Sequence, residues 1–364
     1  EPGLANLRER GRTVLLGDET RTDEHRDRPF EREEPPPPRR FARPHGPQIA
    51  DDTEVHETAT ALVRELLAVP DTHEVLWVQG GASGQFAMLP MNFLGGGVAD
   101  YVDTGSWSKK AQVAAGFYGK PRYAATGKEG ERYVRAPQKL DLSADAKYVH
   151  LTSNATIAGV QYHSFPEVSA PLVADMSSDM LWRPVDVSKF SLIYAGAQKN
   201  LGPAGVALAI IEKSFMAKGN QELPEMLRYD FIASKGSTHN TPPVFAIYAV
   251  GKVLAWVKAQ GGAPAMEKRN RAKAEMLYGT IDGNADFFRC PIEKASRSVM
   301  NVVFNLPTPE LEKAFLDEGK KNGLVNMKGH RSVGGIRISM YNAMDPENIQ
   351  TLTAFMKDFA AKNG

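Results

Sequence analysis

The stretch SLIYAGAQKNLGPAG, residues 191–205, decides the fold of this chain. Its apolar run has the length and continuity of a strand that is buried on both faces of a parallel sheet. The run ends in small residues, which are followed by a single lysine, Lys199, and then by Asn-Leu-Gly-Pro. Because ligands bind outside the carboxyl ends of the strands in open parallel sheets, Lys199 is a candidate functional residue.

The chain around this stretch has the pattern of an α/β protein. Residues 53–67 carry apolar side chains on one helical face, and further apolar strand candidates follow as EVLWVQG, ADYVDTG, YVHLTS, PLVADMS and GVALAII, separated by helices or loops. Such continuous apolar strands with crossovers predict a mostly parallel sheet covered on both faces. We expect this large domain to span residues 53–254.

The last third of the chain has a different texture. SVMNVVFNL and GGIRISMYN alternate as strands do, and the final segment places Ile349, Leu352, Met356 and Phe359 at helical spacing. This pattern predicts a second, smaller α+β domain over residues 255–364.

Residues 1–52 differ from the rest of the chain. The segment RTDEHRDRPFEREEPPPPRRFARPHGP is dense in charge and proline and has almost no apolar periodicity. Such a composition buries too little apolar surface to offset the entropy of ordering. We expect this segment to be disordered or loosely attached. Its composition is equally consistent with an N-terminal segment that is not native to the working protein.

Composition narrows the class of protein. The chain has 364 residues and a net charge of +1, so bulk charge favours neither nucleic acid nor an anionic membrane as a partner. Its single cysteine, Cys290, excludes a disulfide framework and favours a reducing compartment. We see neither a membrane-spanning apolar run nor a signal peptide. We therefore expect a cytoplasmic protein without a metal site.

Polar residues follow several strands of the predicted sheet at the edge where they end. Asp175 follows PLVA, Thr156 lies just after YVHL, and Lys199 follows LIYAGAQ. A lysine away from water favours its neutral amine, which can condense with an aldehyde, and a nearby carboxylate can keep a pyridine nitrogen protonated. Those are the requirements of pyridoxal 5'-phosphate. QGGASGQF offers backbone N–H groups to its phosphate, and Trp107 offers a flat partner to its ring.

Each of these features has an ordinary explanation when it is taken alone. A lysine after a strand is usually a solvated loop charge, Asp175 could cap a turn, and Trp107 could belong to the core. The ordered combination of all of them favours the cofactor site.

Six segments resemble the phosphoserine aminotransferase family, a class V group of the fold-type I pyridoxal-phosphate enzymes. They are QGGASGQFAMLPMNFL, YVDTGSWSKKA, HLTSNATIAGVQ, ADMSSDMLWRPVDVSKFSLIYAGAQKNLGPAG, STHNTPPVFAIY and GHRSVGGIRISMYNAM. The resemblance runs from about residue 53 to the end of the chain. It implies transfer of an amino group between L-glutamate and 3-phosphohydroxypyruvate in serine biosynthesis, with a related vitamin B6 substrate as a second option.

The resemblance also implies roles for individual residues. Lys199 would bond to the cofactor aldehyde and move the substrate proton, and Asp175 would pair with the ring nitrogen. The other expected cofactor contacts are Trp107 on the ring, Thr156 at its hydroxyl side, and Ala82, Ser83 and Gln198 at the phosphate.

Further roles concern the substrate and a second subunit. Asn240 and Thr241 would reach the cofactor phosphate of the partner in a homodimer. Arg337 would bind the substrate α-carboxylate, and His330 and Arg331 would bind its phosphate or the distal carboxylate of glutamate.

The match fails near the start of the chain. The family has a Ser-His-Arg-Ser motif before the first helix, whereas this chain has His45 without a following arginine and Arg43 two residues earlier. All expected cofactor contacts lie beyond residue 52, so we expect cofactor binding to survive and catalysis to be impaired.

Two alternative functions stay open: another class V activity, of the alanine–glyoxylate type, and a non-enzymatic dimeric relative. A cysteine desulfurase is disfavoured because Cys290 lies in an expected strand edge.

Overall fold

The computed structural model describes residues 52–364. The unusual segment predicted at residues 1–52, with Arg43 and His45, lies outside this range except for Asp52, which begins helix α1 (Asp52–Leu66). The boundary predicted between residues 254 and 255 falls within helix α6 (Val244–Ala259), and the division into two domains stays a prediction.

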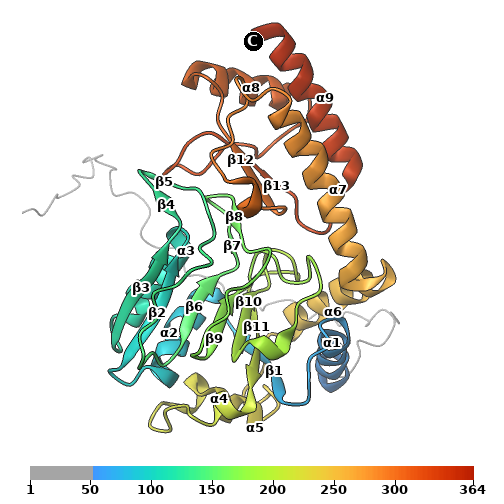
Figure 1. Ribbon diagram of the computed structural model, residues 1–364. Helices are drawn as coiled ribbons and strands as arrows, with labels where there is room; N and C mark the ends of the chain where they lie inside the picture. Colours follow the sequence, from blue (N-terminus) through green and yellow to red (C-terminus); the bar gives the residue numbers. More distant parts are fainter. Residues whose placement is uncertain (1–51) are drawn as a thin grey trace, which may run out of the picture. The chain divides into compact units, whose positions relative to one another are not determined.

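A seven-stranded sheet forms the centre of the described structure (Figure 1). Its order is β1-β11-β10-β9-β6-β2-β3, and it is parallel from β10 to β3 and antiparallel at β1 and β11. The bounds are β1 His73–Gln79, β2 Val98–Asp103, β3 Lys120–Thr126, β6 Val149–Thr152, β9 Leu172–Asp175, β10 Leu192–Gly196 and β11 Val206–Glu212. The predicted mostly parallel sheet is therefore confirmed.

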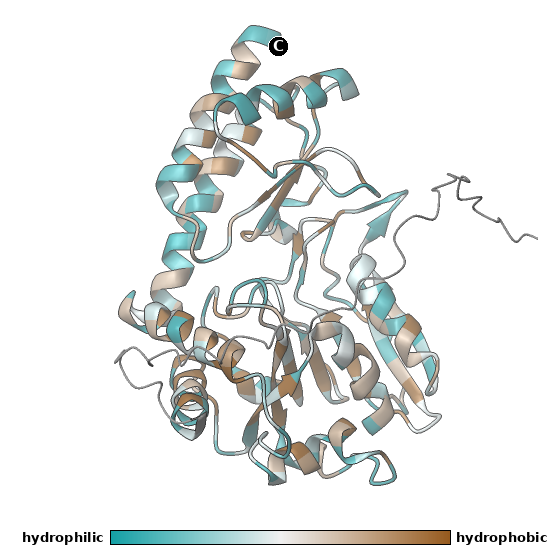
Figure 2. Ribbon diagram, turned by 180° about the vertical axis from the view of Figure 1, so that it is seen from behind, coloured by the Kyte–Doolittle hydropathy of each residue, from teal (hydrophilic) through white to brown (hydrophobic). Residues whose placement is uncertain are grey.

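Two helical layers cover the sheet. Helices α1 and α6 pack with one face, and α2 (Ala82–Phe93), α3 (Ser106–Ala115) and α5 (Tyr229–Ser234) pack with the other. Every residue of β10 is buried, which explains why its sequence shows no alternation. The strands appear as the brown, hydrophobic centre between teal-edged helices in Figure 2.

Shorter elements complete the fold. They are β4 Lys128–Glu129 with β5 Arg132–Tyr133, β7 Asn154–Ala155 with β8 Val160–Gln161, helix α4 Lys213–Met216, and 3₁₀ turns at Val187–Lys189, Glu225–Leu227 and Lys294–Ser296. None of the described helices combines the length and apolar character that crossing a bilayer requires.

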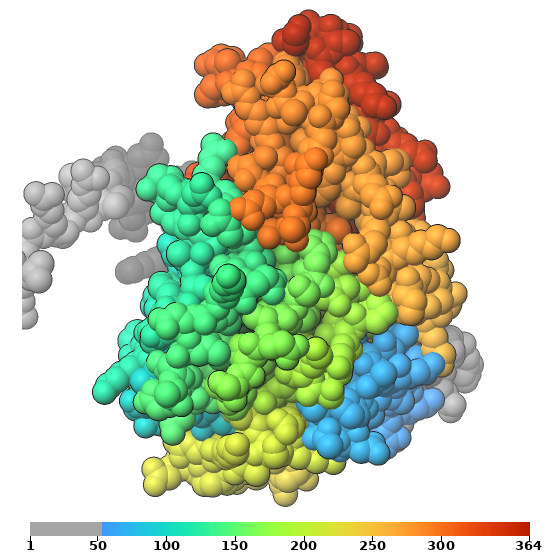
Figure 3. Space-filling model, viewed as in Figure 1, coloured from blue at the N-terminus to red at the C-terminus, as the bar shows by residue number. Residues whose placement is uncertain are grey.

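The C-terminal part has a core of its own. Helices α7 (Gly262–Asp282), α8 (Pro309–Lys321) and α9 (Pro346–Asn363) surround the antiparallel pair β12 (Asn301–Phe304) and β13 (Ile336–Ser339). Its side chains form a separate hydrophobic cluster that includes Leu277, Phe315 and Met356. In Figure 3 these residues, coloured orange and red, adjoin the green residues that follow the sheet strands.

Buried hydrogen bonds join β12 to the edge of the large sheet. The amide of Asn154 donates to Asn301 Oδ1 at 2.8 Å and accepts from Ser298 Oγ at 2.6 Å. Gly159, which precedes β8, has a φ of +76°, and a Cβ there would lie 2.6 Å from a methyl group of Val303. This glycine therefore allows the turn after Thr156 to approach β12.

We expect Gly159→Ala to destabilise the protein by about 2–5 kcal/mol, because the left-handed backbone and the overlap with Val303 add together. Gly205→Ala is the matched control, since Gly205 has a φ of +109° with open space around it. Urea unfolding should show a smaller loss for Gly205→Ala and a partial recovery for Gly159→Ala in a Val303→Ala background. Equal losses for the two single variants would contradict this explanation.

Candidate active site

The sheet brings Asp175 and Lys199 to one edge. Asp175 ends β9 and is the register partner of Tyr194 in the neighbouring parallel strand β10. The chain leaves β10 at Gly196 and turns, so Lys199 lies three residues beyond the same edge. The structure thus places both residues at the carboxyl ends of adjacent strands, as their spacing predicted.

The amine of Lys199 lies over an aromatic ring and is largely shielded from water. Its Nζ is 5.2 Å from the centre of the Trp107 ring. Burial lowers the pKa of Lys199. The negative charges of Asp175 and Asp179 oppose this decrease in pKa, and the positive charge of Arg337 adds to it. A lowered pKa increases the neutral, nucleophilic fraction of the amine near neutral pH.

Asp175 is buried and held by its own backbone turn. Its Oδ1 accepts hydrogen bonds from Ser177 N at 3.0 Å and from Ser177 Oγ at 2.6 Å. Burial raises the pKa of this carboxyl, whereas the bonds from Ser177 and the charge of Lys199 oppose the increase. Ser177 Oγ also accepts from Gly196 N at 2.9 Å, which joins the ends of β9 and β10.

Trp107 and Thr156 form a hydrogen-bonded pair beside Lys199. Trp107 lies in the first turn of α3, where Ser108 Oγ accepts hydrogen bonds from the backbone N–H groups of Thr104 and Gly105. The indole Nε1 of Trp107 donates to Thr156 Oγ1 at 3.0 Å. This bond fixes the ring plane beside Lys199.

Polar groups that suit an anion converge at the end of β10. A Cβ built on Gly196 would lie 2.6 Å from Gln198 Oε1 and 3.1 Å from the backbone nitrogen of Ala82, so the side-chain amide and the start of α2 converge there. Helix α2 begins without a side-chain cap, and the first N–H groups of a helix lack partners within it. This donor set fits a phosphate. The residues present therefore fit pyridoxal phosphate.

The residues expected to bind the substrate do not all line the same cavity as Lys199. His330 and Arg337 line a cavity of about 390 Å³ together with Lys109 and Lys128. Lys199 lines another cavity, of about 430 Å³, with Asn200 and Tyr341. Arg331 is exposed to solvent beside His330.

Asn240 and Thr241 lie elsewhere on the single chain. Asn240 is exposed and lines a mainly apolar cavity next to β1 and the first turn of α2, and the carbonyl of Thr241 accepts from Gln79 Nε2 at 3.2 Å. Within residues 52–364, neither residue forms a hydrogen bond with Lys199 or Gln198. Cys290 is half-buried beside the short bridge at Arg289, and burial raises the pKa of its thiol.

Sequence reasoning missed several residues at this edge. Asp179 is buried, accepts hydrogen bonds from Ser153 Oγ and Gln161 Nε2, and has a pKa raised by burial to about 6. Ser177 was detectable, because an Asp-x-Ser spacing favours a side-chain turn. Asp179 and Asn200 gave no such signal, since their hydrogen-bond partners are distant in the sequence.

No metal-binding cluster of His, Cys, Asp or Glu occurs in the described part of the chain.

Comparison with known proteins agrees with this geometry. The family model described as Aminotransferase class-V matches residues 47–352. The phosphoserine aminotransferase of Lysinibacillus sphaericus is 49% identical over 313 residues, covering 85% of this chain and 86% of the relative.

Solved structures give the same result. Phosphoserine aminotransferase from Bacillus circulans subsp. alkalophilus has a TM-score of 0.84 at 45% identity, covering 87% of this chain and 89% of that one. The PLP-bound enzyme from Trichomonas vaginalis has a TM-score of 0.79 at 36% identity, covering 84% and 88%. The predicted fold class, resemblance and aminotransferase activity are confirmed, and the chain belongs to the class V aminotransferase family.

Proposed function

We propose that this chain is a pyridoxal-phosphate-dependent phosphoserine aminotransferase. It exchanges the amino group of L-glutamate for the oxo group of 3-phosphohydroxypyruvate and forms 2-oxoglutarate and O-phospho-L-serine, a step of serine biosynthesis. The observation that carries the proposal is the Lys199 amine, which lies 5.2 Å from the Trp107 ring centre at the same sheet edge as buried Asp175. The relatives at about half identity supply the substrate class.

The chain's own residues hold the cofactor. Lys199 would bind it covalently, Asp175 would pair with its ring nitrogen, Trp107 would stack on the ring, and Thr156 would bond its hydroxyl side. Its phosphate is held by Ala82, Ser83 and Gln198. When bound, pyridoxal phosphate supplies an electron sink for the bonds at the substrate α-carbon.

The remaining chemistry belongs to the protein. Once the substrate amino group has displaced it from the cofactor, the Lys199 amine, whose neutral form burial favours, would take the proton from the substrate α-carbon and give it back to the α-carbon of the new amino acid in the second half of the reaction. Arg337 presents a planar pair of donors to the α-carboxylate. His330 and Arg331 bind the phosphate or the distal carboxylate. Two separated cationic groups favour this substrate over alanine, which has no second anion.

A homodimer completes the proposed site. Asn240 and Thr241 reach the cofactor phosphate of the partner subunit. Next to them Phe245 is 79% exposed and Tyr248 is 41% exposed in the single chain, and an apolar cavity lies beside Asn240. Exposed aromatic residues beside such a cavity are typical of a subunit interface. We further propose a cytoplasmic location, which a single half-buried cysteine supports.

Replacing Lys199 tests the cofactor assignment. We expect Lys199→Ala to abolish the absorbance of lysine-bound cofactor and to lower turnover by about 10³-fold or more, because the covalent attachment and the proton carrier are both lost. Lys110→Ala is the control. Like Lys199, Lys110 has its Nζ near the Trp107 ring, at 4.7 Å from the ring centre, but Lys110 is exposed to solvent. Unchanged absorbance in Lys199→Ala would refute the assignment.

Two arginine variants test how the substrate anions are divided. Arg337→Lys keeps the charge but loses the paired donors, so KM should rise about 10- to 100-fold for every carboxylate substrate. Arg331→Gln should raise KM for 3-phosphohydroxypyruvate and leave KM for unphosphorylated hydroxypyruvate unchanged. Steady-state kinetics with both acceptors measure this. Equal effects of Arg331→Gln on the two acceptors would contradict its role at the phosphate.

The buried amine should also be visible in stability. In the cofactor-free protein the pKa of Lys199 is lowered below the ordinary 10.5, so the unfolded chain binds the extra proton more readily. The stability of the wild type relative to Lys199→Met should therefore rise as pH increases from the lowered folded-state pKa towards 10.5. Denaturant unfolding at several pH values measures the difference. A difference that falls with rising pH would show that the amine is not desolvated.

A further inference from the structure

Three consecutive backbone carbonyls near the site each accept a hydrogen bond from a different asparagine. They belong to residues 180–182, in the segment that follows Asp175. The bonds are Asn200 Nδ2 to Met180 O at 2.9 Å, Asn342 Nδ2 to Leu181 O at 3.0 Å, and Asn270 Nδ2 to Trp182 O at 3.3 Å. The donors come from the Lys199 turn, the turn after β13, and helix α7, which are far apart in the sequence.

The three asparagines also bond to one another. Asn270 Nδ2 donates to Asn342 Oδ1 at 2.8 Å, and the backbone N–H of Asn342 donates to Asn200 Oδ1 at 3.0 Å. All three side chains are buried, at 5% exposure or less. We call Asn200, Asn270 and Asn342 the asparagine clamp.

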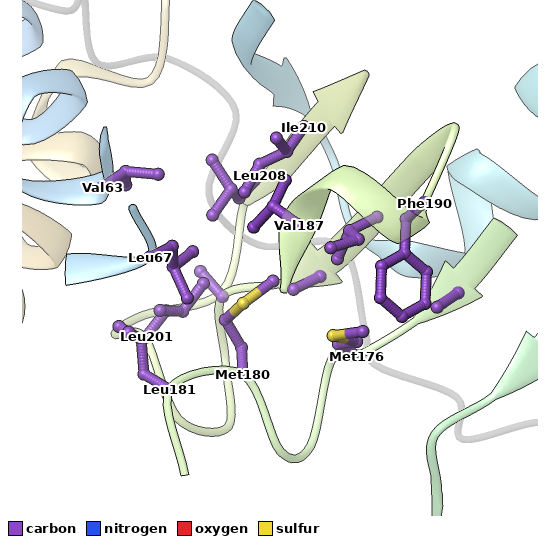
Figure 4. Close-up of a cluster of buried hydrophobic side chains, with 14 of the residues drawn as sticks. Val63, Leu67, Met176, Met180, Leu181, Val187, Phe190, Leu201, Leu208 and Ile210 are labelled. Carbon is purple, nitrogen blue, oxygen red and sulfur yellow. The ribbon is translucent and has the colours of Figure 1, made fainter. Parts of the chain in front are cut away.

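The clamp holds a strained piece of backbone. Leu181 has a φ of +62°, in the left-handed region that a residue with a Cβ seldom adopts. Such a conformation persists only when its surroundings enforce it, and it occurs preferentially at functional sites. Figure 4 shows the side chains of Met180, Leu181 and Leu201 in one buried cluster, so packing and amide bonds act on the same segment.

The clamp also carries a cost. Asn270 Oδ1 is buried and has no hydrogen-bond partner among the described residues. An unpaired buried oxygen destabilises a fold, and an apolar side chain of similar size would avoid the loss. Directional N–H donors are what an apolar replacement could not supply. This favours a role in setting geometry over a role in stability alone.

Helix α7 fixes the turn after β13 a second time. The ammonium group of Lys273, three residues after Asn270, donates to the carbonyls of Met340, Tyr341 and Met344 at 3.0, 2.8 and 3.1 Å. The turn that contains Asn342 is therefore bonded to α7 through two residues, Asn270 and Lys273. Its position determines where β13, which carries Arg337, ends.

Each clamp contact is close in sequence to a residue of the proposed site. Asn200 directly follows Lys199, Asn342 lies in the turn after the strand of Arg337, and residues 180–182 follow the segment of Asp175. We propose that the asparagine clamp is a positioning device that fixes the Lys199 amine and the Arg337 guanidinium relative to Asp175. It rests on the proposed function, because it sets the distance between the cofactor-binding and carboxylate-binding groups of that site.

The test compares two buried asparagines in the cofactor-loaded enzyme. Asn270→Ala removes a clamp amide that bonds two acceptors and does not touch Lys199 or Arg337. Asn92→Ala is the matched control, because Asn92 is also buried and its Nδ2 donates to Met88 O at 2.8 Å and Leu227 O at 2.7 Å, on α2 and near α5. Both variants should lose a similar amount of thermal stability.

Only the clamp variant should change the site. We expect Asn270→Ala to raise KM for glutamate and for 3-phosphohydroxypyruvate about tenfold and to shift the pH midpoint of the absorbance of lysine-bound cofactor. Asn92→Ala should change neither. In a double-mutant cycle, Asn200→Ala and Asn270→Ala should together raise KM by less than the product of their separate effects, because each breaks the same device.

The outcomes separate the two proposals. If the wild type binds the cofactor at Lys199 but does not transaminate O-phosphoserine, the proposed function fails, and the pH midpoint still tests the clamp. If the wild type is active and Asn270→Ala matches Asn92→Ala in both KM and pH midpoint, the clamp proposal is overturned. If Asn270→Ala does not fold, Asn270→Ser, which keeps one donor, takes its place with the same two readouts and the same criterion.

Discussion

Desolvation of one lysine amine beside one buried carboxylate is the constraint on which the rest of the site depends. Burial disfavours the charged form of both groups, because it lowers the pKa of Lys199 and raises that of Asp175. Their mutual attraction opposes both shifts, so the pair is stable only if it is held close and is otherwise hydrogen-bonded. Ser177 meets the second condition at Asp175, and the parallel ends of β9 and β10 meet the first.

This constraint explains the polar bonds around an apolar sheet. The strands buried on both faces carry mainly apolar side chains, and the polar groups of the site lie where the strands end. Ser177 joins β9 to β10, Ser108 bonds to the backbone at the start of α3, and Asn154 joins the edge to β12. Each of these bonds is short-range, but together they extend from the large sheet to the strand pair that carries Arg337.

The sequence predicted what local patterns determine. Continuous apolar strands with polar residues at their ends were sufficient to place Asp175 and Lys199 at one edge, and the Gly-rich turn marked the start of α2. The partners of Asp179, Asn200 and Asn342 were not predictable, because each bond joins segments that only the tertiary fold brings together. Arg331 and Asn240 were predicted from resemblance, and a single chain leaves both at its surface.

The asparagine clamp, like the Lys199–Asp175 pair, depends on buried polar groups that are held at fixed positions. The proposed site needs Arg337 and Lys199 at a fixed separation, yet Arg337 lies on β13 and Lys199 lies in the turn after β10, a strand of a different sheet. Apolar packing resists separation of two segments but allows them to slide, whereas a hydrogen bond to a carbonyl fixes direction as well as distance. Three amides on three successive carbonyls define both position and orientation, and the left-handed Leu181 aligns those carbonyls with their donors.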